Sequence, residues 1–204
     1  MSTSEHWDKI YGTKAPDAVS WYSPHLNTSL DLIERVSPSK STAIIDIGGG
    51  ASTLADDLLA RGYWNLTVLD ISEAAIATTR KRLGANAERV RWLIGDITCI
   101  PLEPARFDVW HDRAVFHFLL DPASRAAYVP QLLHALKPGG HAIISTFGPE
   151  GPTRCSGLDV VRYDSTSLQR ELGPRSQLLD SFTQQHRTPF GTTQQFLYCL
   201  FRLE

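Results

Sequence analysis

The chain has few of the features that mark secreted, metal-binding or membrane proteins. Its 204 residues include only three cysteines, Cys99, Cys155 and Cys199, which lie far apart. This number and spacing match neither a disulfide framework nor paired zinc ligands, so we expect no metal site. No apolar run approaches the ~20 residues that cross a bilayer, and the N-terminus lacks an apolar segment of signal-peptide length. We therefore expect a cytoplasmic protein with no membrane partner.

The charge of the chain is nearly balanced. Lys and Arg number 20 and Asp and Glu number 22, for a net charge of −2. Nucleic-acid-binding domains usually carry a basic surface, so this balance argues against a nucleic-acid partner. Hydrophobic residues make up 42% and charged residues 21% of the chain, as in folded globular proteins. With no internal repeat or linker-like stretch, the sequence predicts one domain over residues 1–204.

Short apolar runs alternate with segments of helical periodicity, which predicts an α/β fold with a doubly wound sheet. The expected parallel strands are residues 43–47, 66–70, 90–94, 107–111 and 141–146. Helices are expected over residues 26–36 and 53–61. Two more are expected to start at the N-caps Ser72 and Asp121 and to run to about Leu83 and Leu136. Two longer runs, 177–186 and 194–203, flank the turn-like TPFGTT and predict a closing antiparallel pair.

A glycine triplet, Gly48-Gly49-Gly50, joins the first strand to the next helix. Glycines there let the backbone turn sharply and approach a ligand. A phosphate-binding P-loop would need a Lys-Ser/Thr pair, and a dinucleotide fingerprint would need glycine in place of Thr53. A purely structural turn remains an alternative, so the triplet alone does not decide between a ligand site and a turn.

Three aspartates end successive strands at one predicted sheet edge. Asp46 precedes the glycine triplet, where it would repel a pyrophosphate but suit a ligand with an ammonium group. Asp70 ends the second strand, where a carboxylate can accept hydrogen bonds from both ribose hydroxyls. Asp96 ends the third and could accept from the exocyclic amine of adenine. Each alone could be a helix cap or a solvated carboxylate, but their shared edge is where ligands bind in such sheets.

Five segments in this order and spacing resemble the motif series of class I S-adenosylmethionine-dependent methyltransferases. They are IIDIGGGAST, LDIS, GDIT, FDVWHDRAVFHFL and LKPGGHAIIST, and together they span residues 43–146. The resemblance implies S-adenosylmethionine as cofactor. It also implies a Rossmann-like sheet of strand order 3-2-1-4-5-7-6 with an antiparallel seventh strand, in agreement with the predicted terminal pair at residues 176–204.

The same resemblance implies a set of cofactor-binding residues. The methionine part of the cofactor would lie among Asp46, Gly48 and Gly50, with His111 beside the sulfonium. The ribose would be held by Asp70, and the adenine would contact Ile71, Asp96 and Ile97.

The N-terminal segment, HWDKIYGTKAPDAVSWYSPHLNTSLDLIE, is similar to that of small bacterial methyltransferases of unassigned substrate. These resemble the lysine methyltransferases of elongation factor 1A and citrate synthase. The resemblance implies a lid over residues 1–36, in which Trp7, Tyr11 and Trp21 cover the cofactor and Tyr22 faces the acceptor. The alternative is that these aromatic residues only anchor an N-terminal helix on the domain.

Candidates for the acceptor side follow the fourth strand. Methyl transfer from a sulfonium needs mostly proximity, orientation and exclusion of water. A base is needed only if the acceptor arrives protonated, and His111, His117 and Asp112 are the candidates. Asp112 and Arg113 could instead position the acceptor or pair with each other, and His117 could be a buried histidine bonded to backbone.

A Gly- and Pro-rich segment, residues 147–165, is expected to form a surface loop over the pocket. Arg154, Cys155 and Tyr163 are its candidate substrate contacts. Cys155 could bind a soft acceptor such as a thiol or metalloid, or be an incidental thiol.

Three functional hypotheses follow. The leading one is methylation of a small molecule. The second is methylation of a protein lysine, although HDRA replaces the Asn/Asp-Pro-Pro-Tyr element of many amine methyltransferases. The third is an inactive cofactor-binding module that serves as an interaction partner.

Overall fold

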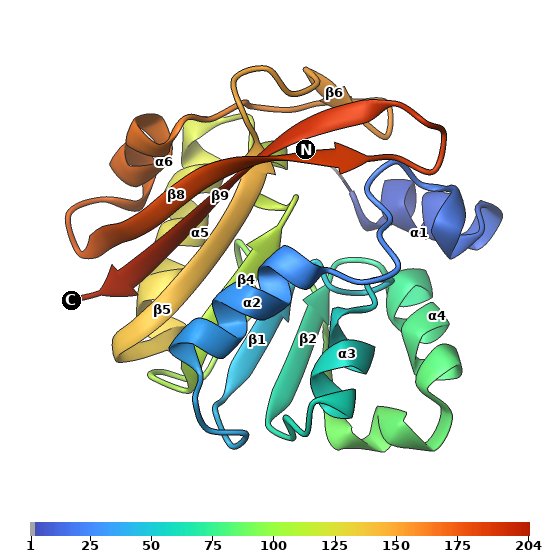
Figure 1. The fold of residues 1–204 in the computed structure, drawn as a ribbon, viewed down its shortest axis with the longest axis horizontal. Helices are drawn as coiled ribbons and strands as arrows, with labels where there is room; N and C mark the ends of the chain where they lie inside the picture. The colour runs from blue at the N-terminus through green and yellow to red at the C-terminus, as the bar shows by residue number, and fades with distance from the viewer. Residues whose placement is uncertain (1–2) are drawn as a thin grey trace.

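A computed structural model describes residues 3–204 and shows a seven-stranded sheet with helices on both faces (Figure 1). The strand order is β3-β2-β1-β4-β5-β9-β8. The strands are β1 Ile44–Ile47, β2 Leu66–Asp70, β3 Val90–Ile94, β4 Phe107–Arg113, β5 Leu136–Phe147, β8 Ser176–Arg187 and β9 Thr193–Leu203. Strands β1 to β5 are parallel, and β9 runs antiparallel to both β5 and β8. The predicted order and the antiparallel seventh strand are confirmed.

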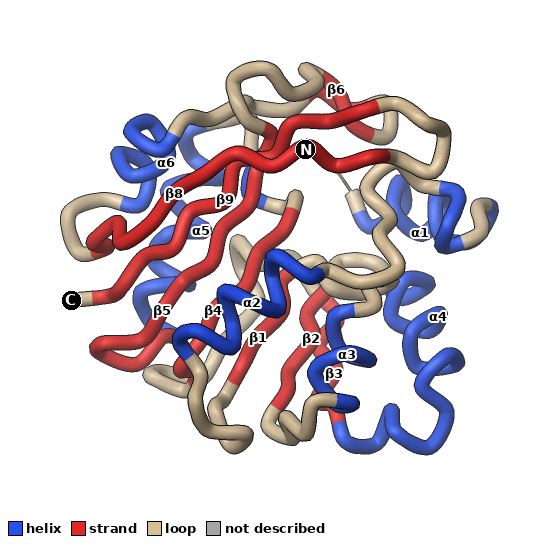
Figure 2. The backbone as a smooth tube through the Cα atoms, in the orientation of Figure 1, coloured by secondary structure: helices blue, strands red, loops and turns tan. Residues whose placement is uncertain are grey.

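Helices cover the sheet in two layers (Figure 2). The helices are α1 Ser4–Thr13, α2 Asn27–Val36, α3 Leu54–Ala60, α4 Glu73–Leu83, α5 Pro122–Ala135 and α6 Ser165–Leu172. Helices α2 and α3 belong to one hydrophobic core, whereas α5 and α6 belong to the other. Within the described range, no helix combines the length and apolar composition that a membrane span requires.

The predicted helix starts are confirmed by their caps. The Ser72 hydroxyl accepts from the backbone N–H of Ala75 at 3.1 Å and begins α4. Asp121 accepts from the N–H of Ser124 at 2.8 Å, and Pro122 occupies the first turn of α5. Each cap satisfies a backbone donor that has no partner within the helix.

Strand β1 lies at the centre of the sheet and contributes to both cores. Ile44 packs into the core under α2 and α3, and Ile45 packs into the opposite core. A parallel strand covered on both faces is apolar at nearly every position. This explains why the sequence signal for β1 is a continuous run.

The structure departs from the predicted elements in several places. Strand β5 begins at Leu136, five residues before the predicted start, and α6 lies where no helix was predicted. Strand β4 extends two residues beyond the predicted end and reaches Arg113, so three candidate residues lie on a strand end. The predicted loop over residues 147–165 contains a small hairpin of β6 (Arg154–Cys155) and β7 (Leu158–Asp159). Its turn places Ser156 and Gly157 at φ of 52° and 80°, the left-handed backbone that two-residue hairpin turns adopt.

Candidate cofactor and acceptor site

Two adjoining cavities open where β1 and β4 lie side by side, the point at which the strand order of the sheet reverses. Ligands of open α/β sheets bind at such a point, beyond the carboxyl ends of the strands. The larger cavity encloses about 940 Å³, including space open to solvent, and the smaller about 510 Å³. Both are lined by Tyr11, Trp21, Ile47, Gly48 and Arg113. Together they form one continuous candidate site.

The glycine triplet begins at the boundary of the two cavities: Gly48 lines both, and Gly49 lines the smaller one. Gly48 has a φ of 68°, and a Cβ there would overlap the Val115 side chain. A Cβ on Gly49 would overlap the Asp46 carboxylate, and one on Gly50 would lie 2.6 Å from Asp70 Oδ2. Only glycine leaves both carboxylates in place, so the triplet is more than a permissive turn.

Asp46 lies at one end of a buried hydrogen-bonded chain that runs through His111 to Ser29. Its Oδ1 lies 2.7 Å from His111 Nδ1, and His111 Nε2 lies 2.9 Å from the Ser29 hydroxyl on α2. Because a carboxylate only accepts, Nδ1 carries the proton, and in the neutral ring Nε2 accepts from Ser29. The other oxygen, Oδ2, is buried and has no hydrogen-bond partner among residues 3–204. Asp46 lines the smaller cavity, and an unpaired carboxylate oxygen of this residue fits a ligand's ammonium group.

Asp70 lines the larger cavity at the end of β2. Its Oδ2 accepts from the N–H of Gly50 at 2.9 Å and its Oδ1 from the N–H of Ser72 at 2.8 Å. Burial raises the pKa of this carboxyl to about 6, and the two backbone donors act in the opposite direction. The carboxylate retains lone pairs toward the cavity, which suits a pair of ribose hydroxyls.

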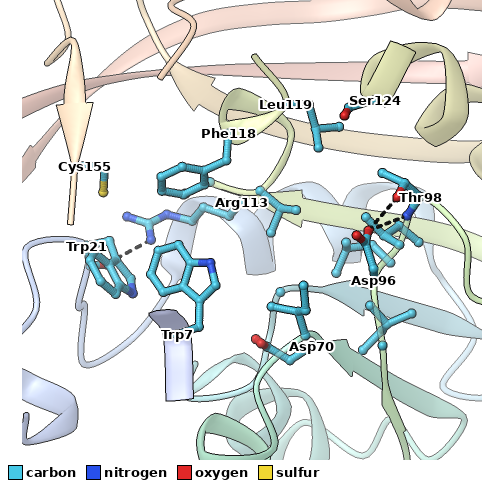
Figure 3. A pocket seen from close by; sticks show the side chains of 18 of the residues that line it. Trp7, Trp21, Asp70, Asp96, Thr98, Arg113, Phe118, Leu119, Ser124 and Cys155 are labelled. Atoms are coloured by element: carbon cyan, nitrogen blue, oxygen red, sulfur yellow. Dashed lines mark hydrogen bonds between the residues drawn. The ribbon is translucent and has the colours of Figure 1, made fainter. Parts of the chain in front are cut away.

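The far end of the larger cavity is a slot lined by Ile71, Asp96, Ile97 and Thr98. Asp96 Oδ1 accepts from both the N–H and the hydroxyl of Thr98 at 2.8 Å, which holds the carboxylate at the rim (Figure 3). Two isoleucines and a carboxylate fit a flat heterocycle that carries an amine.

Aromatic side chains from the N-terminal segment cover this site. Trp7 packs against Phe118 with ring centroids 5.1 Å apart, against Trp21 at 5.8 Å and against Tyr11 at 6.2 Å. All four line the larger cavity, and Tyr22 lines only the smaller one. The predicted lid residues are therefore brought together over the cavities.

Helix α1 is also attached to α4 through Asp8. The Asp8 carboxylate accepts from the Ser72 hydroxyl at 2.6 Å and from the N–H of Ala74 at 3.1 Å. An acid at a helix N-terminus is favoured by the helix dipole. This contact connects the lid to the strand end that carries Asp70.

Arg113 and Cys155 face the side of the larger cavity away from Asp70 (Figure 3). The Arg113 guanidinium donates to the Trp21 carbonyl at 3.0 Å and to the Tyr198 hydroxyl at 3.2 Å. Burial raises the pKa of the Cys155 thiol to about 12, which keeps it protonated at neutral pH.

Two candidate catalytic residues lie outside the lining of both cavities. His117 is fully buried, its Nδ1 accepts from the N–H of Phe147 at 3.2 Å, and burial lowers its pKa to about 3. Asp112 accepts from Tyr128 at 2.6 Å and from the N–H of Val115 at 3.0 Å. Asp112 makes no ion pair with Arg113, so that expectation is wrong: the two side chains alternate to opposite faces of β4.

Two candidate substrate contacts also lie away from the cavities. Tyr163 is buried in the core, where its ring packs against Phe116 at 5.6 Å between centroids. Arg154 is exposed on the small hairpin and pairs with Asp159 at 3.1 Å. Of the three loop candidates, the structure brings only Cys155 to the site.

Sequence reasoning missed several residues that shape the site. Ser29 reaches His111 from a helix 82 positions earlier in the chain, and no local pattern indicates such a contact. Phe118 joins the lid, and an aromatic residue after the fourth strand was a usable signal. Within residues 3–204, no group of three or more His, Cys, Asp or Glu side chains could hold a metal ion.

Comparison with known proteins places this geometry in a family. Residues 44–140 match the model of a methyltransferase domain. This span contains the glycine triplet and all three strand-end aspartates. The matched residues 44–140 form a methyltransferase domain of the class I S-adenosylmethionine-dependent type. Its cofactor is therefore S-adenosylmethionine, and the unpartnered Asp46 oxygen and the Asp70 carboxylate fit that ligand's ammonium and ribose groups.

Similar proteins differ in what they act on. The chain is 26% identical over 120 residues to the eEF1A lysine and N-terminal methyltransferase of Mus musculus, covering 59% of this chain and 17% of that protein. The chain spans less than half the length of the first curated relatives that it matches.

Two solved structures share the fold over 98% of the chain. One, from work on the conversion of a disulfide bond into a thioacetal group during echinomycin biosynthesis, has a TM-score of 0.79 at 18% identity and is covered over 91% of its length. The other is the Burkholderia thailandensis 1,6-didemethyltoxoflavin-N1-methyltransferase with bound 1,6-didemethyltoxoflavin and S-adenosylhomocysteine. It has a TM-score of 0.69 at 20% identity and is covered over 83%.

Proposed function

We propose that this protein transfers the methyl group of S-adenosylmethionine to a small-molecule acceptor by in-line displacement. The cofactor supplies a methyl group on a sulfonium, whose leaving group is neutral and needs no proton. The protein then has to bind, orient and exclude water.

The structure contains residues suited to binding the cofactor, orienting it and excluding water. Asp46, held by His111, which Ser29 holds in turn, presents one free carboxylate oxygen to the ammonium end. Asp70 and Asp96 orient the ribose and the adenine at the ends of the next two strands. The aromatic rings of the N-terminal segment cover the cavity and keep water from the reacting end.

The observation that carries the small-molecule proposal is the chemistry of the acceptor end. His117 and Asp112 lie outside the cavities, and both ring nitrogens of His111 are hydrogen-bonded. No general base lines this end among the described residues, so the acceptor has to arrive without a proton to lose. The small-molecule acceptor in the name of the Burkholderia neighbour, which shares the fold over 98% of this chain, supports this class.

A protein lysine is the second candidate, because the name of the mouse relative includes one. A lysine reaches a methyltransferase as an ammonium and has to lose a proton before attack. It would also have to pass the aromatic rings and approach the Arg113 guanidinium. Both features favour the small molecule.

A labelled-methyl experiment separates these hypotheses. S-adenosylmethionine carrying a labelled methyl group is incubated with the protein and a bacterial lysate, which is then split by molecular size. We expect label in the small-molecule fraction. Label in the protein fraction would support lysine methylation instead, and no transfer despite cofactor binding would indicate an inactive binding module.

An Asp70→Ala variant assayed in parallel measures the background labelling by other enzymes of the lysate. It removes the acceptor of two backbone donors and of the ribose contact, each worth ~1.5–3 kcal/mol for a charged acceptor. Cofactor affinity should fall at least about tenfold. Label that persists in the variant comes from other enzymes of the lysate.

A further inference from the structure

The side of the larger cavity away from Asp70 and Asp96 holds a guanidinium without a counterion (Figure 3). Arg113 ends β4 and lines both cavities. Among residues 3–204, no carboxylate lies within ion-pair distance of it. Its three assigned contacts are neutral: the Trp21 carbonyl, the Tyr198 hydroxyl and the ring of Phe196, whose centroid lies 4.5 Å from the guanidinium carbon.

These contacts hold the guanidinium in one place without neutralising it. Arginine cannot lose its proton in a protein, so the charge stays. Its effect reaches neighbouring rings: burial lowers the pKa of His186, and the charge of Arg113 lowers it further. A partly buried cation with neutral surroundings is a strong attractor for an anion, since Arg binds carboxylate and phosphate through paired N–H donors.

The surroundings of Arg113 are apolar. Trp7, Trp21 and Phe118 present rings around it, and the neutral Cys155 thiol lies beside it (Figure 3). An ammonium at this place would meet Arg113 and the sulfonium, two positive charges. An acid anion with an apolar or aromatic body meets complementary charge and complementary walls.

We propose that the methyl acceptor is a small organic anion, bound through its negative group by Arg113. This inference rests on the proposed function and narrows its substrate class. It also agrees with the missing base if the negative group is itself the nucleophile. Its oxygen then bonds to the methyl carbon as the carbon–sulfur bond breaks, S-adenosylhomocysteine leaves as a neutral sulfide, and no proton has to be removed.

The cofactor also carries a carboxylate, at its methionine end, and the experiment has to separate the two sources. The protein is saturated with S-adenosylhomocysteine and titrated calorimetrically with benzoate, an aromatic carboxylate. Benzyl alcohol serves as the neutral probe of similar shape. The same titrations are made with Arg113→Gln and with Arg113→Lys, which keeps the charge.

We expect benzoate to bind the wild-type complex at least about tenfold more tightly than benzyl alcohol, as for one charge-assisted pair. Arg113→Gln should abolish that preference, Arg113→Lys should keep part of it, and neither should change S-adenosylhomocysteine affinity more than about threefold. Intact S-adenosylhomocysteine binding also shows that the variants are folded.

Three results overturn the proposal. The first is equal binding of benzoate and benzyl alcohol to the wild-type complex. The second is no saturable binding of benzoate in the millimolar range. The third is an Arg113→Gln variant that loses affinity for S-adenosylhomocysteine but not for 5′-methylthioadenosine, which lacks the carboxylate; Arg113 would then bind the cofactor. Failure of the wild-type protein to bind S-adenosylhomocysteine would instead refute the proposed function.

Discussion

Replacing Asp46 by asparagine changes one charge in the site while keeping the size of the side chain. The amide oxygen of the Asp46→Asn variant can still accept from His111 Nδ1, so the chain to Ser29 remains intact. The free Oδ2, which has no partner among the described residues, becomes an NH₂ group. A donor then faces the ammonium of the ligand in place of a carboxylate oxygen.

The expected loss follows from the one hydrogen bond that changes. A hydrogen bond to a charged group contributes ~1.5–3 kcal/mol. This corresponds to roughly a 10- to 150-fold rise in the Kd of S-adenosylhomocysteine. Thermal unfolding of the unliganded variant should remain near that of the wild type, because the buried contacts of Oδ1 persist.

Isothermal titration calorimetry measures this loss, and 5′-methylthioadenosine provides the control. It carries the adenosine part but neither the ammonium nor the carboxylate, so Asp46→Asn should leave its Kd within about twofold. The reasoning is refuted if S-adenosylhomocysteine binds the variant as tightly as the wild type. It is also refuted if both ligands lose the same affinity, since Asp46 would then act only through the fold.

Three further perturbations test other parts of the site. The raised pKa of Asp70, about 6, predicts that the Kd of S-adenosylhomocysteine rises as pH falls, because a protonated carboxyl is a weaker hydrogen-bond acceptor. At pH 5 about a tenth of the Asp70 carboxyl groups are ionised, so calorimetry should show a ~tenfold loss of affinity. The Asp70→Asn variant should show no such change with pH. His117→Ala should lower the free energy of unfolding by ~2–4 kcal/mol in denaturant titrations, because the ring packs against Phe147 and accepts a hydrogen bond from its N–H. A loss of S-adenosylhomocysteine affinity with unchanged stability would contradict this structural role of His117. Asp8→Ala should speed amide hydrogen exchange in α1 and weaken S-adenosylhomocysteine severalfold, whereas Asp17→Ala, at an exposed acid of the same segment, should do neither.

The parallel core was predictable because its signals are local and repeated. Buried strands such as β1 leave continuous apolar runs, and caps such as Ser72 mark where helices begin. The hairpin β6–β7 was not, because two-residue strands are too short to produce an alternating pattern. Its turn does contain Gly157, but the sequence around it is rich in glycine throughout.

The same distinction between local and tertiary signals applies to the residues of the site. Asp46, Asp70 and Asp96 lie within two residues of the ends of strands whose positions the pattern sets, so their common edge follows from the fold class. The orientation of His117 depends on a three-residue helical turn after β4, whose phase no periodicity reveals. The contact between Ser29 and His111 depends on how α2 packs on the sheet, which is a tertiary property. Long-range pairs of this kind need the structure.

The most direct test of the account is a crystal structure of the protein with S-adenosylhomocysteine. The account predicts the ammonium of the ligand within hydrogen-bonding distance of Asp46 Oδ2, the ribose hydroxyls on Asp70 and the adenine between Ile71 and Ile97. The sulfur should then face the side of the cavity that carries Arg113. A ligand bound outside these cavities, or bound in them with its ammonium away from Asp46, would contradict the account.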